Sequence, residues 1–173
     1  MQHIYNSNIP SAIATLSCVF SMQLTHFTDF GLRILIYLTG VPDGEVVTIK
    51  EISAQFNVPQ NHLNKIANRL GKLGWVEATP GRNGGLRLNI EPASLLLGDI
   101  LQTLEGHPAL VDCEKPACAL KGNCNLKRIL DLGLRDFFAA MNQYSLADLT
   151  QSPTSDVIAR MHFQPRSLSA RPH

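Results

Sequence analysis

The sequence has almost no net charge and no long apolar run. Its 15 lysines and arginines nearly balance 14 aspartates and glutamates, which leaves a formal net charge of +1. Any surface that binds nucleic acid must therefore be local, because the chain as a whole is not basic. No apolar stretch reaches the roughly 20 residues that a helix needs to cross a bilayer. We therefore expect no membrane partner.

Cysteine is scarce and unevenly placed. Only four cysteines occur in 173 residues, and three of them lie between positions 113 and 124. An odd cluster of this kind does not divide into the pairs of a secreted disulfide framework, so it favours metal or redox chemistry in a reducing cytoplasm. The remaining cysteine, Cys18, is expected to be incidental.

The sequence also lacks the pattern of a catalytic pocket. Outside the cysteine cluster it offers no constellation of His, Ser or paired carboxylates that would suggest a nucleophile or a general base. We therefore expect a binding protein and not an enzyme. The length of 173 residues suits one ordinary domain with a long appendage.

The first residues need separate treatment. Residues 9–20 resemble the apolar region of a signal peptide, but no Lys or Arg precedes them. An export signal begins with a positively charged region, so export is not expected. Residues 1–21 are instead predicted to be a disordered extension upstream of a start at Met22.

Helical periodicity begins after Met22. Apolar residues recur at helical spacing and predict a first amphipathic helix over residues 27–39. Thr48 and Glu51 have the spacing of a capping box and predict the start of a second helix. Pro59 then begins a third helix, which Gly74 ends. Two short helices across a tight turn predict a helix-turn-helix.

A β-hairpin is predicted directly after the third helix. Residues 75–79 and 86–90 have the pattern of strands, and the glycine-rich segment 80–85 has the pattern of a turn. A hairpin in this position is a wing. Residues 22–92 are therefore predicted to be a winged helix-turn-helix DNA-binding domain.

The rest of the chain is predicted to be helical as far as residue 150. One helix follows Pro92, and a long helix after the cysteines carries apolar residues at alternating steps of three and four. So wide an apolar stripe needs a partner, so residues 93–150 are predicted to supply a helix, a cysteine loop and a long C-terminal dimerisation helix. Residues 151–173 are predicted to be a disordered tail. The expected fold class is mostly α with a small β-hairpin.

The start of the third helix carries side chains that can recognise bases. Gln and Asn can bond bidentately to adenine, and the N-terminal end of a recognition helix enters the major groove. Lysine and arginine on neighbouring faces suit phosphates, and an arginine at the wing tip could enter a narrow minor groove. The candidate contacts to an operator are Thr48, Gln60, Asn61, His62, Asn64, Lys65, Arg69, Arg82 and Asn83. The alternative is a merely solvated helix face, and the adjoining wing favours DNA.

The cysteine loop places Cys113, Cys118 and Cys124 within one short segment. Three thiolates can hold three corners of an iron-sulfur cluster or three positions on zinc. The zinc alternative is supported by His107, which lies close in sequence, but the loop lacks the tight Cys-x-x-Cys pair of most zinc knuckles. A redox switch by disulfide formation is a third possibility. A fourth ligand must come from elsewhere in the protein.

Four ordered motifs resemble one known family. They are residues 22–38, 61–66, 82–88 and 110–127, and the likeness runs from Met22 to about Leu149. These segments are similar to the NsrR subfamily, the nitric-oxide-sensing repressors of the Rrf family. The resemblance implies a homodimer crossed by the long C-terminal helix. It also implies an iron-sulfur cluster, 4Fe-4S in preference to 2Fe-2S, which is damaged by nitric oxide to relieve repression of nitrosative-stress genes.

The resemblance also implies a fourth ligand. The matching position is Asp29, contributed from the first helix of the partner subunit. From the sequence alone, Asp29 could simply favour a helix N-terminus and pair with Arg33 four residues later. The iron-sulfur biogenesis regulators of the same family use a His just after the third cysteine, and Asn125 stands there instead. An iron-sulfur or redox-status regulator of the same family and a zinc-stapled winged-helix protein are the alternative functions.

Overall fold

The structure is a computed structural model that describes residues 23–81, 84–106 and 109–163. The predicted extension at residues 1–21, together with Cys18, lies outside the described residues. So do the wing-tip residues Arg82 and Asn83, the zinc candidate His107 and the end of the chain from residue 164.

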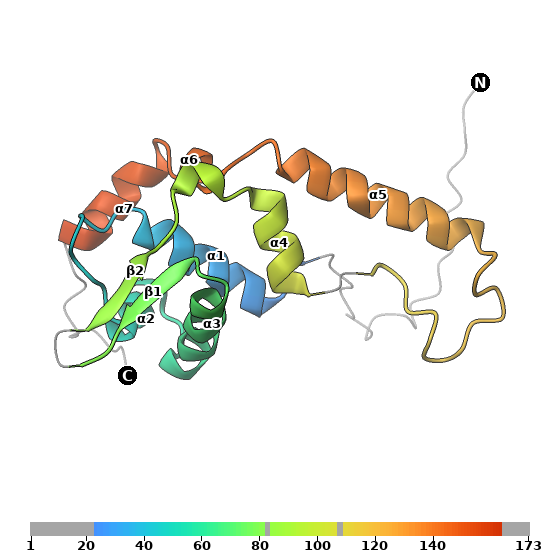
Figure 1. The fold of residues 1–173 in the computed structure, drawn as a ribbon, viewed down its shortest axis with the longest axis horizontal. Coiled ribbons are helices and arrows are strands. Elements are labelled where there is room, and N and C mark those ends of the chain that lie inside the picture. Colours follow the sequence, from blue (N-terminus) through green and yellow to red (C-terminus); the bar gives the residue numbers. More distant parts are fainter. Residues whose placement is uncertain (1–22, 82–83, 107–108, 164–173) are drawn as a thin grey trace, which may run out of the picture.

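The first half of the described chain is a winged helix-turn-helix (Figure 1). Its helices are α1 (His26–Leu38), α2 (Ile49–Phe56) and α3 (Gln60–Lys72), and its two strands are β1 (Val76–Thr79) and β2 (Gly85–Leu88). The predicted fold class, mostly helical with one small antiparallel hairpin, is confirmed.

The turn between α2 and α3 follows from its local sequence. Thr48 caps α2, and the side chain of Glu51 reaches back to the Thr48 N–H, so the predicted capping box is present. Asn57 ends the helix in the left-handed conformation, with φ of 53° and ψ of 45°, which Asn tolerates better than most residues. Pro59 then stands at the N-cap of α3. The chain thus reverses within a few residues and sets α3 beside α2.

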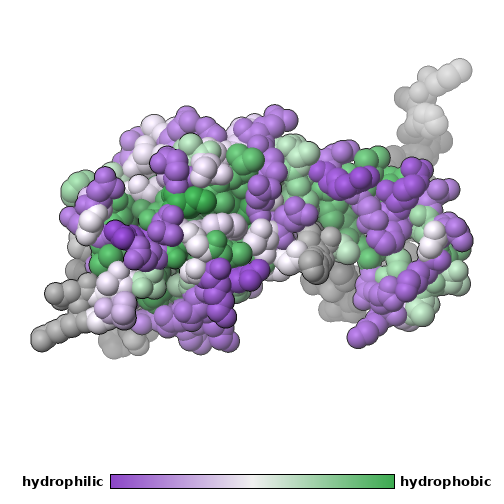
Figure 2. Space-filling view, viewed as in Figure 1, coloured by the Kyte–Doolittle hydropathy of each residue, from purple (hydrophilic) through white to green (hydrophobic). Residues whose placement is uncertain are grey.

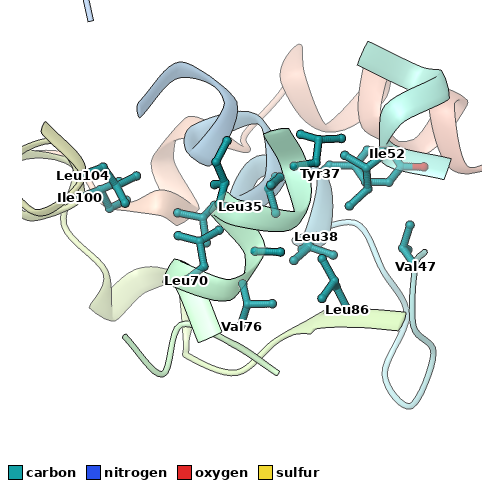
Figure 3. Packing of buried hydrophobic residues seen from close by; sticks show 14 of the residues in the cluster. Leu35, Tyr37, Leu38, Val47, Ile52, Leu70, Val76, Leu86, Ile100 and Leu104 are labelled. Carbon is teal, nitrogen blue, oxygen red and sulfur yellow. The ribbon is translucent and has the colours of Figure 1, made fainter. Parts of the chain in front are cut away.

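The hydrophobic core lies between α1, α3 and the hairpin (Figure 3). Leu35 and Leu38 of α1 and Leu70 of α3 are at most 2% exposed. Complete burial of such a side chain stabilises a fold by about 1.5–3 kcal/mol. Val76 and Leu86 extend this core onto the inner face of the hairpin. The core therefore holds α3 against α1 and leaves the opposite face of α3 in solvent.

The wing hairpin is fixed by its strand register. Val76 pairs with Leu88 and Thr79 with Gly85, so the strands are antiparallel without a bulge. Leu86 also forms a bridge with Val47, which joins the segment before α2 to the wing.

The second half of the described chain is a helical extension. The 3-10 turn η1 (Pro92–Ser94) leads into α4 (Leu97–Glu105), and α5 (Asn125–Met141) follows the cysteine loop. Asn142, the C-cap of α5, accepts a hydrogen bond from the Asp99 N–H and donates one to the Asp99 carboxylate, both at 2.9 Å. These bonds tie the start of α4 to the end of α5.

The long helix α5 extends away from the winged-helix body, and the cysteine loop lies at its far end (Figure 1). None of its 17 residues is buried, not even the large apolar ones: Ile129 is 57% exposed and Phe137 is 41% exposed. In the space-filling view its surface carries apolar residues beside polar ones (Figure 2). An exposed apolar stripe on a helix is the pattern of an interface with another chain.

The prediction of a disordered tail from residue 151 is wrong for its first part. After α6 (Leu146–Leu149), residues 154–163 form helix α7 (Thr154–Phe163), which packs on α1. Ile158 is buried, and the His162 ring stacks on Tyr37 with centroids 4.1 Å apart. The prediction relied on the Ser and Pro content of this segment. It overlooked a helical pattern, in which Met161 and His162 follow Ile158 by three and four residues.

No helix in the described part of the chain is long and apolar enough to cross a membrane.

Candidate DNA-binding surface and cysteine loop

Helix α3 presents one polar face to solvent. Its inward residues Leu63, Ile66, Ala67 and Leu70 are all buried. The predicted DNA contacts on this helix, by contrast, are all exposed: Gln60, Asn61, His62, Asn64, Lys65 and Arg69. The core therefore sets α3 so that the whole predicted contact face is accessible.

Three of these side chains differ in whether they already have a partner. The Asn61 side-chain oxygen accepts a hydrogen bond of 2.9 Å from the His62 N–H, so it is engaged with the first turn of its own helix. Lys65 and Arg69 form no salt bridge with any residue that the structure describes. They are thus available to phosphates, whereas Asn61 must exchange a local bond for a base.

Thr48 is exposed but fully engaged in its helix cap. Its hydroxyl donates to Glu51 Oε2 at 2.8 Å and accepts from the Glu51 N–H at 3.2 Å. Its backbone N–H also donates to that carboxylate at 2.6 Å. The contact predicted for Thr48 would therefore require the cap to rearrange.

The wing carries one basic residue that is already paired. Arg87 donates to Glu77 Oε2 from Nε at 2.9 Å and from Nη2 at 2.6 Å, and the two residues lie opposite each other in the strand register. The tip residues Arg82 and Asn83, predicted as DNA contacts, lie outside the described residues, so their contacts remain predictions.

The three clustered cysteines are free thiols of intermediate exposure. The loop folds on itself, because the Cys118 N–H donates to the Cys113 carbonyl at 3.1 Å. Cys124 is the N-cap of α5, where its sulfur accepts from the Lys127 N–H at 3.5 Å. Two of the thiols therefore share a closed turn, and the third caps the N-terminus of α5.

The environment of Cys113 shows that the thiols interact. Partial burial raises the pKa of Cys113, the neighbouring Cys118 raises it further, and Lys127 opposes both effects. The hydrogen bond from Lys127 to Asp131 raises the pKa of Lys127 in turn, which keeps this lysine cationic. Negative charge on Cys118 thus raises the pKa of Cys113, and the positive charge of Lys127 opposes this effect.

Cations surround a hollow of about 920 Å³ beside the loop, which Cys113 and Cys124 both line. Lys121 pairs with Glu114 at 2.8 Å and Lys127 with Asp131 at 2.7 Å. Two further cations line the hollow, Arg128 and Arg135, and neither forms a salt bridge within residues 23–81, 84–106 and 109–163.

These cations were not among the residues predicted from the sequence. Their spacing in the sequence could have indicated this arrangement. After Cys124, charged residues recur at steps of three and four, which places them on one face of α5: Lys127, Arg128, Asp131 and Arg135.

Over the described residues, the thiols are not drawn together into a geometry ready to hold a metal ion. Asp29, the predicted fourth ligand, is instead bound to Arg33, as the simpler sequence interpretation expects. The three cysteines thus share one loop without forming a metal site among the described residues, and Asp29 on α1 of the same chain is paired with Arg33.

A second hollow, of about 880 Å³, lies between α1, α4 and α5 and is mainly apolar. Its lining includes Leu32, Leu101 and Phe138. Phe137 belongs to the exposed stripe of α5 and also lines this hollow, as does Leu24, which directly precedes the N-cap of α1.

Comparison with solved structures shows the same fold in several regulators. CymR, the global cysteine regulator of B. subtilis, is 26% identical, with a TM-score of 0.61 over 79% of this chain and 98% of that chain. The oxidised form of Staphylococcus aureus CymR is 21% identical, with a TM-score of 0.60 over 75% and 97% of the two chains. IscR from T. potens is 20% identical, with a TM-score of 0.59 over 75% and 86%.

A family model gives the assignment. The model for Rrf2, described as iron-dependent transcriptional regulator, matches residues 24–152, which include the winged helix, the cysteine loop and α5. Proteins of this family are transcriptional regulators and not enzymes. The chain therefore belongs to the Rrf2 family and is a DNA-binding transcriptional regulator.

Proposed function

We propose that this regulator is a repressor that holds an iron-sulfur cluster on Cys113, Cys118 and Cys124 and senses nitric oxide through it. The observation that carries the proposal is the set of three free, half-buried thiols in one loop, beside a hollow lined by Arg128 and Arg135, which have no salt-bridge partner among the described residues. The description of the family as iron-dependent supports iron in this loop.

The donor chemistry fits the cluster. Iron-sulfur clusters are held by thiolates, and a cluster with three thiolate ligands carries net negative charge. Arg128 and Arg135 line the same hollow and have no carboxylate partner among the described residues, so they can compensate that charge. The cap of α5 at Cys124 adds the positive end of a helix dipole.

The fourth ligand in this proposal is Asp29 of the partner subunit. Two observations support it: α5 lacks a buried residue, and an apolar hollow adjoins both α5 and the start of α1. A homodimer that crosses along α5 would cover this surface and bring α1 of one chain toward the other. Oxygen is a weaker donor to iron than thiolate, which suits a site that must come apart. We expect 4Fe-4S, with 2Fe-2S as the alternative.

When bound, the cluster supplies iron that nitric oxide can attack. The protein's part is to convert the state of this site into DNA affinity. In a dimer the two α3 helices must fit half-sites about 34 Å apart, one turn of DNA. A coupling of about 1–3 kcal/mol between the thiol site and that spacing would suffice for a useful response. The regulated genes would serve defence against nitrosative stress, and the regulator would act in the cytoplasm.

The test is anaerobic purification of the full chain, followed by absorption spectroscopy, iron and sulfide analysis and operator binding before and after nitric oxide. We expect a coloured protein whose operator affinity falls on treatment. Cys118→Ala should lose both properties, whereas Cys18→Ala is a matched control that should keep them. An iron-free wild-type protein, or one that binds its operator equally with and without the gas, would overturn the proposal.

A second candidate is a redox-status regulator that acts through the thiols themselves. The similarity to CymR, named as a cysteine regulator, and the closed turn from Cys113 to Cys118 favour it. Disulfide formation on mild oxidation, in a protein isolated without iron or zinc, would support this function. A colourless protein that contains zinc would instead support a zinc-stapled regulator.

A further inference from the structure

The N-terminal cap of α1 is completed by a residue from another helix. The backbone N–H of Thr25 donates to Glu105 Oε1 at 2.8 Å, and the Thr25 hydroxyl donates to the same oxygen at 3.2 Å. Thr25 is the N-cap of α1, and Glu105 is the last residue of α4. The contact thus joins two helices across 80 positions of sequence.

Comparison with α2 shows what Glu105 does. In α2, the N–H and the hydroxyl of the N-cap Thr48 both donate to Glu51, three residues later in the same helix. In α1 the equivalent third position is Thr28, which has no carboxylate and only a hydroxyl 3.1 Å from that of Thr25. Glu105 therefore supplies from α4 the carboxylate that a capping box normally takes from its own helix. A carboxylate at a helix N-terminus is also favoured by the helix dipole.

The helix turn that Glu105 holds is the one that carries Asp29. The Asp29 N–H donates to the Thr25 carbonyl at 2.9 Å, as the first intrahelical bond from the N-cap. Glu105 itself stands where α4 ends and the segment leading to Cys113 begins. One carboxylate thus fixes the end of α4 to the turn of α1 that carries the proposed fourth ligand.

One turn further along α1, the same two helices meet the DNA-binding helix. A Cβ on Gly31 would lie 2.7 Å from Leu104 Cδ1 of α4 and 3.6 Å from Ile66 Cγ2 of α3. Glycine therefore allows α4, α1 and α3 to approach at this point. A shift of Leu104 at the end of α4 would therefore displace α1 at Gly31, where α1 also contacts the buried face of α3.

We propose that Glu105 is a positioning residue that holds the first turn of α1, and with it Asp29, against the end of α4. The inference rests on the proposed function for its effect on the cluster, but not for the clamp itself. Loss of the carboxylate frees the α1 cap, which lets Asp29 shift relative to the site that it would complete in the dimer.

The first test needs no cluster. Amide hydrogen exchange is measured over residues 25–31 of the full-length, iron-free protein for wild type, Glu105→Ala, Glu105→Gln and Gln102→Ala. Gln keeps an oxygen acceptor, and Gln102 is an exposed neighbour on α4 that serves as the matched control. Loss of a helix cap should raise exchange by about fivefold in Glu105→Ala, with most of the protection restored in Glu105→Gln. Equal exchange in Glu105→Ala and Gln102→Ala would overturn the clamp.

If Glu105→Ala fails to fold, Thr25→Val serves in its place, because it removes the hydroxyl and keeps the backbone N–H. Exchange over residues 25–31 should then rise by a smaller factor. Wild-type exchange in this variant would overturn the clamp.

The second test follows the visible absorbance of the anaerobically loaded protein in a chelator. We expect the cluster to decay about fivefold faster in Glu105→Ala than in wild type, with Glu105→Gln close to wild type. Decay at the wild-type rate in Glu105→Ala would overturn the positioning role. A wild-type protein that binds no iron would overturn the proposed function, whereas the exchange result would still decide the clamp.

Discussion

Arg33 holds Asp29 in a two-point ion pair on one face of α1. Arg33 Nη2 lies 2.8 Å from Asp29 Oδ2, and Arg33 Nε lies 3.0 Å from Asp29 Oδ1. The two side chains are 44% and 37% exposed, so a pair of this kind contributes only about 0.3–0.5 kcal/mol. A metal ion could therefore displace the guanidinium at little cost, and the pair is compatible with a carboxylate that serves as a ligand in the dimer.

The ion pair and the ligand role make different predictions for Asp29→Asn and Arg33→Gln. We expect Asp29→Asn to release its cluster to a chelator at least about tenfold faster than wild type, because even changes outside the ligand set cost that much in metal affinity. Arg33→Gln should keep the cluster at least as long as wild type, because it frees the carboxylate. Decay of absorbance under anaerobic conditions measures both.

Both variants should unfold within about 0.5 kcal/mol of wild type when cluster-free, because the pair is exposed. Equal cluster lifetimes in wild type and Asp29→Asn would remove Asp29 from the ligand set.

Cys124 has two roles that can be separated. Its sulfur caps α5 through the Lys127 N–H, and its thiolate is a proposed cluster ligand. Serine is a better helix cap but a harder ligand, and alanine is neither. We therefore expect cluster-free Cys124→Ser to be at least as stable as wild type. Cys124→Ala should lose about 1 kcal/mol of unfolding free energy.

Neither Cys124 variant should hold iron. Urea denaturation of the cluster-free proteins and iron analysis of the anaerobic preparations measure the two effects independently. A Cys124→Ser protein with a full iron complement would show that this thiol is not a ligand.

Sequence reasoning succeeded where local chemistry decides the structure. The Thr48–Glu51 cap, the Pro59 start of α3 and the strand pattern of the wing depend on neighbouring residues, and all three occur as expected. The apolar spacing of α3 likewise predicted which residues are buried and therefore which polar residues are exposed.

Contacts between distant segments were not predictable in the same way. Nothing near Glu105 in the sequence indicates that it caps α1, because the contact depends on how α4 crosses α1. The burial of α7 on Tyr37 was missed for the same reason, since its short stripe is convincing only once α1 is there to receive it. The ion pair between Asp29 and Arg33 was predictable, because the two residues are four positions apart in a helix. A role of Asp29 in the partner's cluster site was not, because it depends on a second chain.

The DNA face can be dissected with Lys65 and Asn61. Lys65 is exposed and free of salt bridges within the described residues, so Lys65→Ala should weaken binding to all sequences and reduce the slope of log affinity against log salt by about 1. Asn61→Ala should relax preference at particular bases, at a cost of about 1–3 kcal/mol for the preferred operator.

Operator binding at several salt concentrations distinguishes these effects. Arg160→Ala is the control, because Arg160 is an exposed basic residue on α7, a helix that lies apart from α3 (Figure 1). The assignment of α3 as the recognition helix fails if Lys65→Ala and Arg160→Ala share the wild-type salt slope and Asn61→Ala keeps wild-type preference.

Helix α7 can be tested as part of the folded domain by two neighbouring residues. Ile158 is 4% exposed and Val157 is 45% exposed, although they are adjacent in sequence. Ile158→Ala should therefore lower the unfolding free energy by about 2–5 kcal/mol, as for other buried aliphatic truncations. Val157→Ala should change it by less than about 0.5 kcal/mol, because its side chain is largely in solvent.

Urea denaturation followed by circular dichroism measures both α7 variants. His162 provides a second observation on the same contact, because its ring stacks on Tyr37 and its Nε2 lies 3.0 Å from the Tyr37 carbonyl oxygen. His162→Ala should also lower the unfolding free energy, as Ile158→Ala does, because each substitution removes packing between α7 and the rest of the domain. If Ile158→Ala and Val157→Ala unfold at the same urea concentration, residues beyond 151 do not belong to the cooperative fold, and the tail predicted from their composition is the better description.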